Sequence, residues 1–313
     1  MKASPLLFAV ALAFCVPAFA AEPAAAPAMP ANRFAASAVP AERFEVGSML
    51  VERHGQRGRA VILIPGLGSG AWAWQDTVRE YSGQYTLYVV TLPGFDGRPA
   101  VAGAGFEAAR TALTQLIAAR QLDKPVLIGH SMGAALALAV ASRSPDLVGG
   151  VIAVDGLPVF PGTEGMTGDQ RLAMAQGAKA RMAGMAGPMF ASGQQQYMRA
   201  AGTVDMARAD ELARLSSRSD PAAVSDYMAE TLALDLRPGL GAIKAPVLVL
   251  APYFEADAGA GGITAQAKAG YYRSLMAGTP KLQVVAVDGA RHFVMFDQPR
   301  QVNEAIGRFL KSL

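Results

Sequence analysis

The chain has 313 residues, of which 52% are hydrophobic and 17% are charged. This length and composition allow one substantial core and exclude a disordered or coiled-coil protein, and a single α/β domain of this size is ordinary. The formal net charge is only +3 and the basic residues are spread singly along the chain, so nothing indicates a nucleic-acid partner.

The first 20 residues are typical of a cleavable signal peptide. Lys2 supplies a positive charge, residues 6–16 form a short apolar stretch, and Ala-Phe-Ala at 18–20 is a typical cleavage site, so the mature chain is expected to begin at Ala21. The apolar stretch is too short to span a bilayer as a mature helix, which makes a membrane anchor the less favoured alternative. Because Cys15 is the only cysteine, the mature chain would have no disulfide. We predict a periplasmic or secreted protein without a stable membrane anchor.

The folded domain is expected over 42–313, after an alanine- and proline-rich linker at 21–41 that cannot bury a core. Two short strand patterns at 43–46 and 49–53 open this domain. A fully apolar strand follows at 60–64, as expected where helices cover both faces of a sheet.

Strand and helix patterns then alternate along most of the chain. The expected segments are a helix ending near 81, a strand at 85–91, a helix at 106–120, a strand from 126, a helix ending near 143, a strand at 148–154, a strand at 246–250, a helix at 264–276, a strand at 282–287 and a helix at 299–310. This alternation predicts an α/β fold with a mostly parallel eight-stranded sheet and helices on both faces.

Residues 157–237 interrupt the alternation, because they show weak helical patterns and no strand pattern. They also hold eight of the chain's 14 methionines. We expect a helical cap inserted after the sixth strand. Its methionines would fill irregular gaps in a core or would form an adaptable acyl pocket over a site. Trp72 and Trp74 are equally compatible with core packing and with the entrance of such a pocket.

The most informative stretch is Gly-His-Ser-Met-Gly at 129–133, between an apolar strand and an alanine-rich helix. Gly-x-Ser-x-Gly in a strand–turn–helix context is the nucleophile-elbow pattern. The turn is so tight that side chains at Gly129 and Gly133 would clash. The motif therefore predicts that Ser131 is a nucleophile.

A serine nucleophile needs a base, and the chain has three histidines. His54 lies in an early turn, and His130 directly precedes the nucleophile. His292 follows the last expected strand, and loops at the carboxyl ends of parallel strands converge on one edge of a sheet. Taken alone, His292 would be an ordinary surface-loop histidine. Its position relative to the elbow makes it the predicted base.

These features resemble the α/β-hydrolase superfamily. The resemblance covers about 45–312 and rests on the order of strands and helices and on three motifs: Ile-Pro-Gly-Leu-Gly at 64–68, Gly-His-Ser-Met-Gly at 129–133 and Arg-His-Phe at 291–293. Val-Asp-Gly-Leu-Pro at 154–158 and Ala-Arg-His-Phe at 290–293 are similar to a group of bacterial exported serine hydrolases. The resemblance implies hydrolysis of a carboxylic (acyl) ester of a small-molecule substrate through an acyl-enzyme.

Three carboxylates are candidates for the acid of a Ser-His-Asp triad. The acid usual in the superfamily follows the seventh strand, where Glu255 and Asp257 stand, but the usual Gly-x-x-Asp turn is absent there. Asp155 ends the sixth strand, where a carboxylate is costly unless it has a partner such as a histidine N–H. The similarity to the exported group also favours Asp155, which is our prediction. Asp257 and Glu255 stay open as alternatives, and a turn cap is the non-catalytic explanation of Asp155.

The resemblance also implies an oxyanion hole formed by the backbone N–H groups of Leu67 and Met132. No metal is expected, because the histidines and acids lack ligand spacing. No cofactor is expected either, since the glycine-rich loop lacks the phosphate-binding ending. A peptidase, lactonase or thioesterase on the same fold and a non-catalytic binding protein are the alternative functions. The sequence carries no signal for an oligomeric state.

Overall fold

A computed structural model describes residues 38–182, 184–185, 187–258 and 261–313. The predicted signal peptide and most of the predicted linker lie outside these residues. Within the described part of the chain, no helix combines the length and the hydropathy that crossing a membrane requires.

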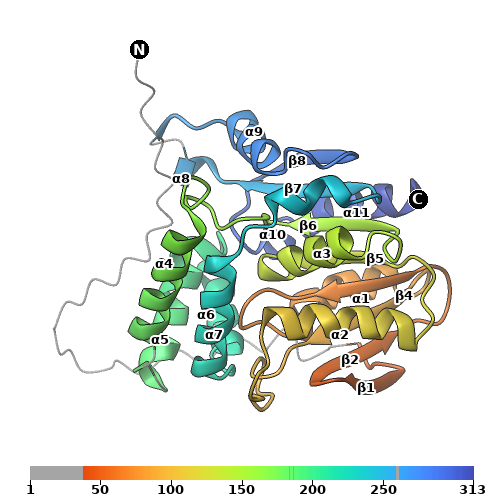
Figure 1. The fold of residues 1–313 in the computed structure, drawn as a ribbon, viewed down its shortest axis with the longest axis horizontal. Helices are drawn as coiled ribbons and strands as arrows, with labels where there is room; N and C mark the ends of the chain where they lie inside the picture. Colours follow the sequence, from red (N-terminus) through yellow and green to blue (C-terminus); the bar gives the residue numbers. More distant parts are fainter. Residues whose placement is uncertain (1–37, 183, 186, 259–260) are drawn as a thin grey trace.

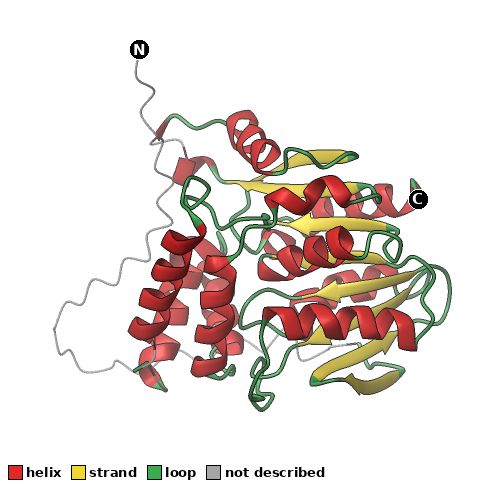
Figure 2. Cartoon of the chain, in the orientation of Figure 1, coloured by secondary structure: helices red, strands yellow, loops and turns green. Residues whose placement is uncertain are grey.

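An eight-stranded sheet runs through the molecule (Figures 1 and 2) in the order β1-β2-β4-β3-β5-β6-β7-β8. Its strands are β1 (Glu42–Val46), β2 (Met49–His54), β3 (Ala60–Ile64), β4 (Thr86–Thr91), β5 (Val126–His130), β6 (Gly150–Val154), β7 (Val247–Tyr253) and β8 (Leu282–Asp288). The pairs β1–β2 and β2–β4 are antiparallel, and the other five pairs are parallel. The predicted mostly parallel eight-stranded sheet is confirmed.

Helices cover both faces of this sheet, which explains why its central strands are apolar throughout. The helices α2 (Phe106–Ala119), α3 (Met132–Arg143) and α9 (Ala265–Leu275) share one core cluster with alternate strand residues such as Ile62 and Ile64. The helices α1 (Gln75–Tyr81) and α11 (Pro299–Lys311) share the opposite cluster with Val61 and Leu63. Successive side chains of a strand point to opposite faces, so each face needs its own apolar set.

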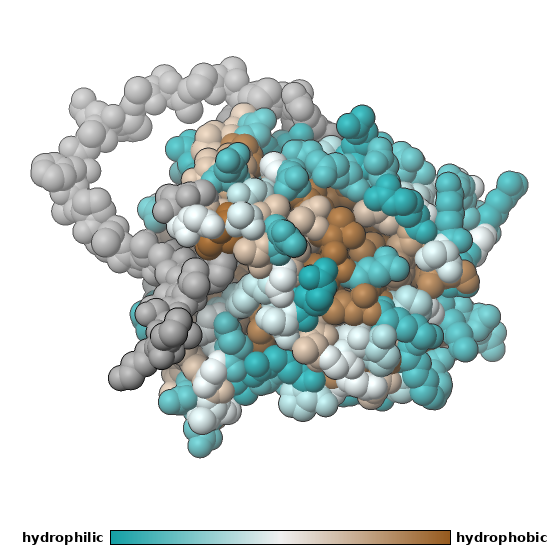
Figure 3. All heavy atoms as spheres, turned by 90° about the horizontal axis from the view of Figure 1, so that it is seen from above, coloured by the Kyte–Doolittle hydropathy of each residue, from teal (hydrophilic) through white to brown (hydrophobic). Residues whose placement is uncertain are grey.

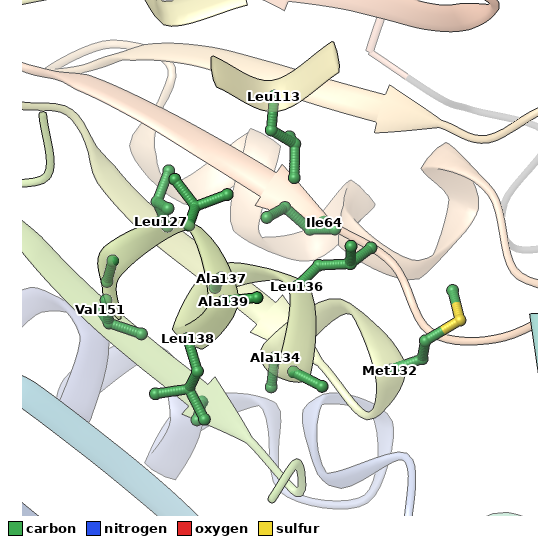
Figure 4. Packing of buried hydrophobic residues seen from close by; sticks show 14 of the residues in the cluster. Ile64, Leu113, Leu127, Met132, Ala134, Leu136, Ala137, Leu138, Ala139 and Val151 are labelled. Carbon is green, nitrogen blue, oxygen red and sulfur yellow. The ribbon is translucent and has the colours of Figure 1, made fainter. Parts of the chain in front are cut away.

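Helix α3 lies against the sheet over its whole length. All its residues from Met132 to Ala141 are buried, and many are alanines. Small side chains let the helix approach the strands closely, while Leu136 and Leu138 fill the space around Ile64, Leu127 and Val151 (Figure 4). The residue directly before this packed helix is Ser131, so the position of the serine is fixed by the core.

Between β6 and β7 the described residues form four α-helices and a π-helix, which stand together beside the sheet (Figure 1), and then a 3-10 helix, η3 (Arg237–Ala242), that leads to β7. The helices beside the sheet are α4 (Gly168–Met182), α5 (Pro188–Tyr197), the π-helix η2 (Met198–Gly202), α6 (Met206–Ser216) and α7 (Pro221–Ala233). The ends of this segment meet where Val159 pairs with Asp235 in an isolated antiparallel bridge. We call 157–237 the helical insertion.

The last strand, β8, forms an edge of the sheet and pairs with β7. Its residue Val285 is 38% exposed. Seen from the side of β8 and α9, the surface carries an apolar area surrounded by hydrophilic side chains (Figure 3).

Trp72 and Trp74 are buried, with exposed fractions of 5% and 0%. Both belong to a core cluster, so core packing accounts for them.

Candidate active site

Ser131 stands at the tight turn between β5 and α3. Its φ is 54° and its ψ is −122°, a left-handed backbone that a residue with a side chain seldom adopts. A Cβ atom at Gly129 would lie 2.2 Å from the carbonyl oxygen of Gly133, and one at Gly133 would lie 2.3 Å from the carbonyl oxygen of Ile64. Both positions therefore require glycine, and the turn is the one that the elbow motif predicts.

The glycine-rich loop after β3 packs directly against this turn. A Cβ atom at Gly66 would lie 3.1 Å from the Cβ of Ser131, so only a glycine lets the loop come this close. Among the described residues, the backbone N–H groups of Leu67 and Met132 donate no hydrogen bond. Met132 is the first residue of α3, where N–H groups have no partner within the helix. Both predicted oxyanion donors are therefore available to a ligand.

His292 lies beside the elbow, in the loop that follows β8. The centroid of its ring is 4.6 Å from that of His130, and its carbonyl oxygen is 2.9 Å from Nε2 of His130. Its Nδ1 is 2.6 Å from Oδ2 of Asp155. An imidazole that donates from Nδ1 keeps Nε2 free to accept a proton. No hydrogen bond joins His292 to Ser131 in this structure, and such catalytic contacts often tighten only when substrate binds.

Asp155 leaves the end of β6 with a φ of 44°, and its backbone N–H is fixed by the carbonyl oxygen of Leu250 at 3.0 Å. Its side chain is 12% exposed. Burial acts to raise the pKa of this carboxyl, but the charge of His292 and its hydrogen bond outweigh burial, so the pKa of Asp155 lies below its ordinary value. The carboxylate is therefore ionised where it meets the imidazole.

The two alternative acids lie elsewhere. Asp257, on α8 (Glu255–Ala258), forms a two-pronged ion pair with Arg291 at 2.7 Å for each contact. Glu255 is exposed at the first position of the same short helix. Of the three candidate carboxylates, Asp155 is the one that contacts His292.

His130 is buried and has a structural role that the sequence did not reveal. Burial, together with the neighbouring His292, lowers the pKa of His130 to about 3, so the ring is neutral and is a poor base. Because the carbonyl of His292 can only accept, Nε2 of His130 must carry the proton and donate it. His130 thus holds the main chain of the loop that carries the predicted base.

Tyr272 is a second residue that sequence reasoning missed. It lies on α9 and is 5% exposed. Its hydroxyl donates a hydrogen bond to Oδ1 of Asp155, the carboxylate oxygen that His292 leaves open. Burial, followed by the charge of Asp155, raises the pKa of Tyr272 well above its ordinary value, so the phenol stays protonated. No local pattern around Tyr272 signals this contact, which spans 117 positions.

The helical insertion holds the His292 loop through its π-helix η2. The backbone N–H groups of His292 and Phe293 donate to the carbonyl oxygens of Ala201 and Gly202, at 3.1 and 2.8 Å. Ala201 and Gly202 are the last two residues of η2, where carbonyl groups have no partner within the helix, and π-helices are frequent at functional sites. The insertion therefore contacts the site directly.

The insertion also holds the glycine-rich loop on the other side of the elbow. Ser219, buried between α6 and α7, donates its hydroxyl hydrogen to the carbonyl oxygen of Gly68 at 2.9 Å. The same hydroxyl accepts the backbone N–H of Asp96 at 3.0 Å. This one side chain links the insertion to the loop that carries Leu67.

The methionines of the insertion differ widely in burial. Met198 is 2% exposed and belongs to a core cluster. Met189 and Met206 are 62% and 43% exposed. These three side chains therefore do not support a shared acyl pocket. Within the described residues, no group of three or more histidine, cysteine, aspartate or glutamate side chains is placed to hold a metal ion.

Comparison with known proteins identifies the family. The model of the alpha/beta hydrolase family matches 61–305. The pimeloyl-acyl-carrier-protein methyl ester esterase of Edwardsiella ictaluri is 31% identical over 102 residues, which are 33% of this chain and 38% of that protein. The enzyme of the same name from Aliivibrio salmonicida is 28% identical over 119 residues, which are 38% of this chain and 44% of that protein. The matches thus span less than half the length of these relatives.

Solved structures show the same fold. A thermophilic esterase from Thermogutta terrifontis superposes with a TM-score of 0.67 at 22% identity, covering 87% of this chain and 99% of that one. An enol-lactonase from Burkholderia xenovorans superposes with a TM-score of 0.67 at 16% identity, covering 86% of this chain and 100% of that one. At these identities the likeness concerns the fold alone.

Proposed function

This chain belongs to the alpha/beta hydrolase family, and from that premise we propose that it is an exported serine hydrolase that cleaves carboxylic esters through an acyl-enzyme. The observation that carries the proposal is the 2.6 Å contact between Nδ1 of His292 and Asp155, formed beside the strained elbow that presents Ser131. The matches to ester-cleaving relatives support the choice of an ester as substrate.

In the first half of the proposed reaction, the Ser131 oxygen attacks the acyl carbonyl carbon while Nε2 of His292 takes the hydroxyl proton. Asp155 stabilises the imidazolium that forms. The carbonyl oxygen becomes an oxyanion, which the N–H groups of Leu67 and Met132 bind. When the tetrahedral intermediate collapses, the bond to the alcohol breaks and His292 gives its proton to the leaving oxygen.

In the second half, water replaces the alcohol. His292 takes a proton from the water, whose oxygen attacks the acyl carbon of the Ser131 ester. The same N–H groups stabilise the second oxyanion. Collapse of this intermediate breaks the bond to Ser131, which regains its proton from His292, and the carboxylic acid leaves. Each group ends the cycle as it began.

The substrate proposal is tested with purified mature protein and p-nitrophenyl esters of graded acyl chain length. We expect turnover of at least one ester, and a loss on the order of 10⁶-fold in kcat for Ser131→Ala. Ser144→Ala is the matched control, because Ser144 follows the far end of α3. Full activity of Ser131→Ala would refute the role of Ser131, and absence of hydrolysis over the whole panel would favour a peptidase or a binding protein.

The export proposal rests on the charged and apolar pattern of the first 20 residues. Expression of the full chain in a Gram-negative host should release a protein into the periplasmic fraction whose first residue is Ala21. Recovery in the cytoplasm with Met1 or Lys2 at the N-terminus would contradict it.

A further inference from the structure

The carboxylate of Asp155 is held at both of its oxygen atoms. Oδ2 lies 2.6 Å from Nδ1 of His292, and Oδ1 accepts the hydroxyl hydrogen of Tyr272. The rotation of an aspartate carboxylate about its last bond is intrinsically broad. One hydrogen bond to His292 therefore leaves the carboxylate free to turn, whereas a second donor on the other oxygen fixes its plane.

The hydroxyl of Tyr272 is itself held in place. Tyr272 lies in the last turn of α9, whose first residue is Ala265. The hydroxyl of the preceding residue, Thr264, caps the helix by accepting the N–H of Ala267 at 3.1 Å. The helix packs against β7 and β8, and its Leu275, which is 5% exposed, shares a core cluster with Val247 and Val249 of β7. Figure 1 shows α9 lying along the β8 side of the sheet. The phenol is thus presented to Asp155 from a packed helix.

We infer that Tyr272 is a positioning residue for the reaction, which orients the Asp155 carboxylate so that Oδ2 faces His292. The inference rests on the proposed function, in which His292 is the base. Tyr272 does not touch the reacting atoms and acts through Asp155.

The titratable groups around Asp155 determine what the loss of the Tyr272 hydroxyl should do. Besides Tyr272, the titratable groups that act on or around this carboxylate are His292, Lys268, Tyr197 and His130. Without the phenol, Oδ1 would lose its donor in a site that water hardly reaches, so the negative charge would rest more on Oδ2. The imidazolium would then be bound more tightly and in a less fixed orientation.

Tyr272→Phe removes the hydroxyl and keeps the ring. We expect kcat for a p-nitrophenyl ester to fall roughly 10-fold, KM to stay within about twofold, and the acid limb of the kcat/KM profile to move to higher pH. Tyr271→Phe is the matched control, because the neighbouring hydroxyl donates to Glu164 at 3.2 Å. Equal kinetics and equal pH profiles of Tyr272→Phe and wild type would overturn the inference.

A double-mutant cycle separates positioning from general stability. Because Tyr272 acts through Asp155, Tyr272→Phe should have almost no further effect on kcat in an Asp155→Ala background. A full additional 10-fold loss in that background would mean that the Tyr272 hydroxyl acts by a route other than its contact with Asp155, and would overturn the inference.

A spectroscopic measurement keeps this test independent of the proposed reaction. The proton between His292 and Asp155 should give a downfield ¹H resonance that is lost in His292→Gln. We expect Tyr272→Phe to shift this resonance and Tyr271→Phe to leave it in place, whether or not any ester is cleaved. An unshifted resonance in Tyr272→Phe would overturn the inference, whereas wild-type protein without esterase activity would refute only the proposed function.

Discussion

At the scale of single residues, Ser131 and Asp155 both hold a left-handed backbone, with φ values of 54° and 44°. Such a conformation costs about 1–3 kcal/mol for a residue with a side chain and persists only where its surroundings fix it. Here the backbone N–H of Ser131 donates to the carbonyl oxygen of Val154, and that of Asp155 donates to the carbonyl oxygen of Leu250, at 3.0 Å each. The neighbouring strands therefore hold the two turns that present the proposed nucleophile and acid.

The identity of the acid gives a prediction at this scale. Asp155→Asn keeps the size of the side chain but removes the charge that stabilises the imidazolium, so turnover should fall on the order of 10³–10⁴-fold. Asp257→Asn breaks a partly exposed ion pair with Arg291, and its turnover should stay within about threefold of wild type. Steady-state kinetics with one ester checks both variants. An equally large loss of turnover in Asp257→Asn would mean that the acid of the triad lies after β7 instead.

At the scale of secondary structure, most of the fold could be predicted because its signals are local. The apolar run at 126–128 lies within β5, and the strand expected at 85–91 is Thr86–Thr91. The position of His292 could be predicted too. His292 follows the last expected strand, and the loops after parallel strands lie together at one edge of the sheet.

The supporting contacts could not be predicted in this way. The π-helix η2 binds the His292 loop through carbonyl oxygens, which every residue type carries. Ser219 and Tyr272 reach Gly68 and Asp155 across 151 and 117 positions. Hydrogen bonds between residues so far apart in the sequence produce no hydrophobic periodicity and no compositional bias in the segments that form them.

Asp297 gives a prediction about how the elements are joined. It ends the short helix α10 (Val294–Asp297), and its carboxylate accepts the backbone N–H of Val204 from the insertion and that of Arg291 from the His292 loop, at 3.0 and 2.8 Å. Asp297→Ala leaves both N–H groups unpaired. We expect the free energy of unfolding to fall by about 1–3 kcal/mol and kcat to fall roughly 10-fold.

Urea unfolding and ester kinetics measure the two effects. Glu304→Ala is the control, because Glu304 lies on α11 and makes only long, exposed contacts of 4.0 and 3.9 Å with Arg300 and Arg308. A kcat unchanged in Asp297→Ala would show that the link through Asp297 does not help to place His292.

At the scale of the whole molecule, the helical insertion and the sheet meet on both sides of the elbow. The insertion reaches the glycine-rich loop through Ser219 and the His292 loop through Ala201 and Gly202. Asp96 lies in the same junction, in the loop after β4. Its side chain is 3.3 Å from the guanidinium of Arg218, and a Cβ atom at Gly70 would lie 2.2 Å from its Oδ2. The junction is therefore tightly packed.

This junction makes stability depend on pH. Burial raises the pKa of Asp96 to about 6, although Arg218 acts to lower it and Glu52 adds to the rise. An unfolded aspartate has a pKa of about 3.9, so the folded protein binds an extra proton between about pH 4 and pH 6. The contribution of Asp96 to the free energy of unfolding is fully present below about pH 4 and is lost as the pH rises to about 6.

Asp96→Asn should therefore raise the free energy of unfolding at pH 7.5, on the order of 1 kcal/mol, and leave it unchanged at pH 4. Asparagine also tolerates the left-handed φ of 50° at this position. Asp146→Asn, which alters an exposed ion pair with Lys244, should show no such pH-dependent gain. Urea unfolding at both pH values checks this, and a loss of stability at pH 7.5 would mean that the ion pair with Arg218 outweighs burial.

The central claim is that Ser131 forms a covalent acyl-enzyme with His292 as its base, and intact-protein and peptide mass spectrometry after a fluorophosphonate probe tests it most directly. We expect one equivalent of probe on the peptide that contains Ser131, no adduct in Ser131→Ala, and labelling slowed by several orders of magnitude in His292→Gln. A probe found on another residue, or labelling of the wild-type protein no faster than that of Ser131→Ala, would contradict the claim.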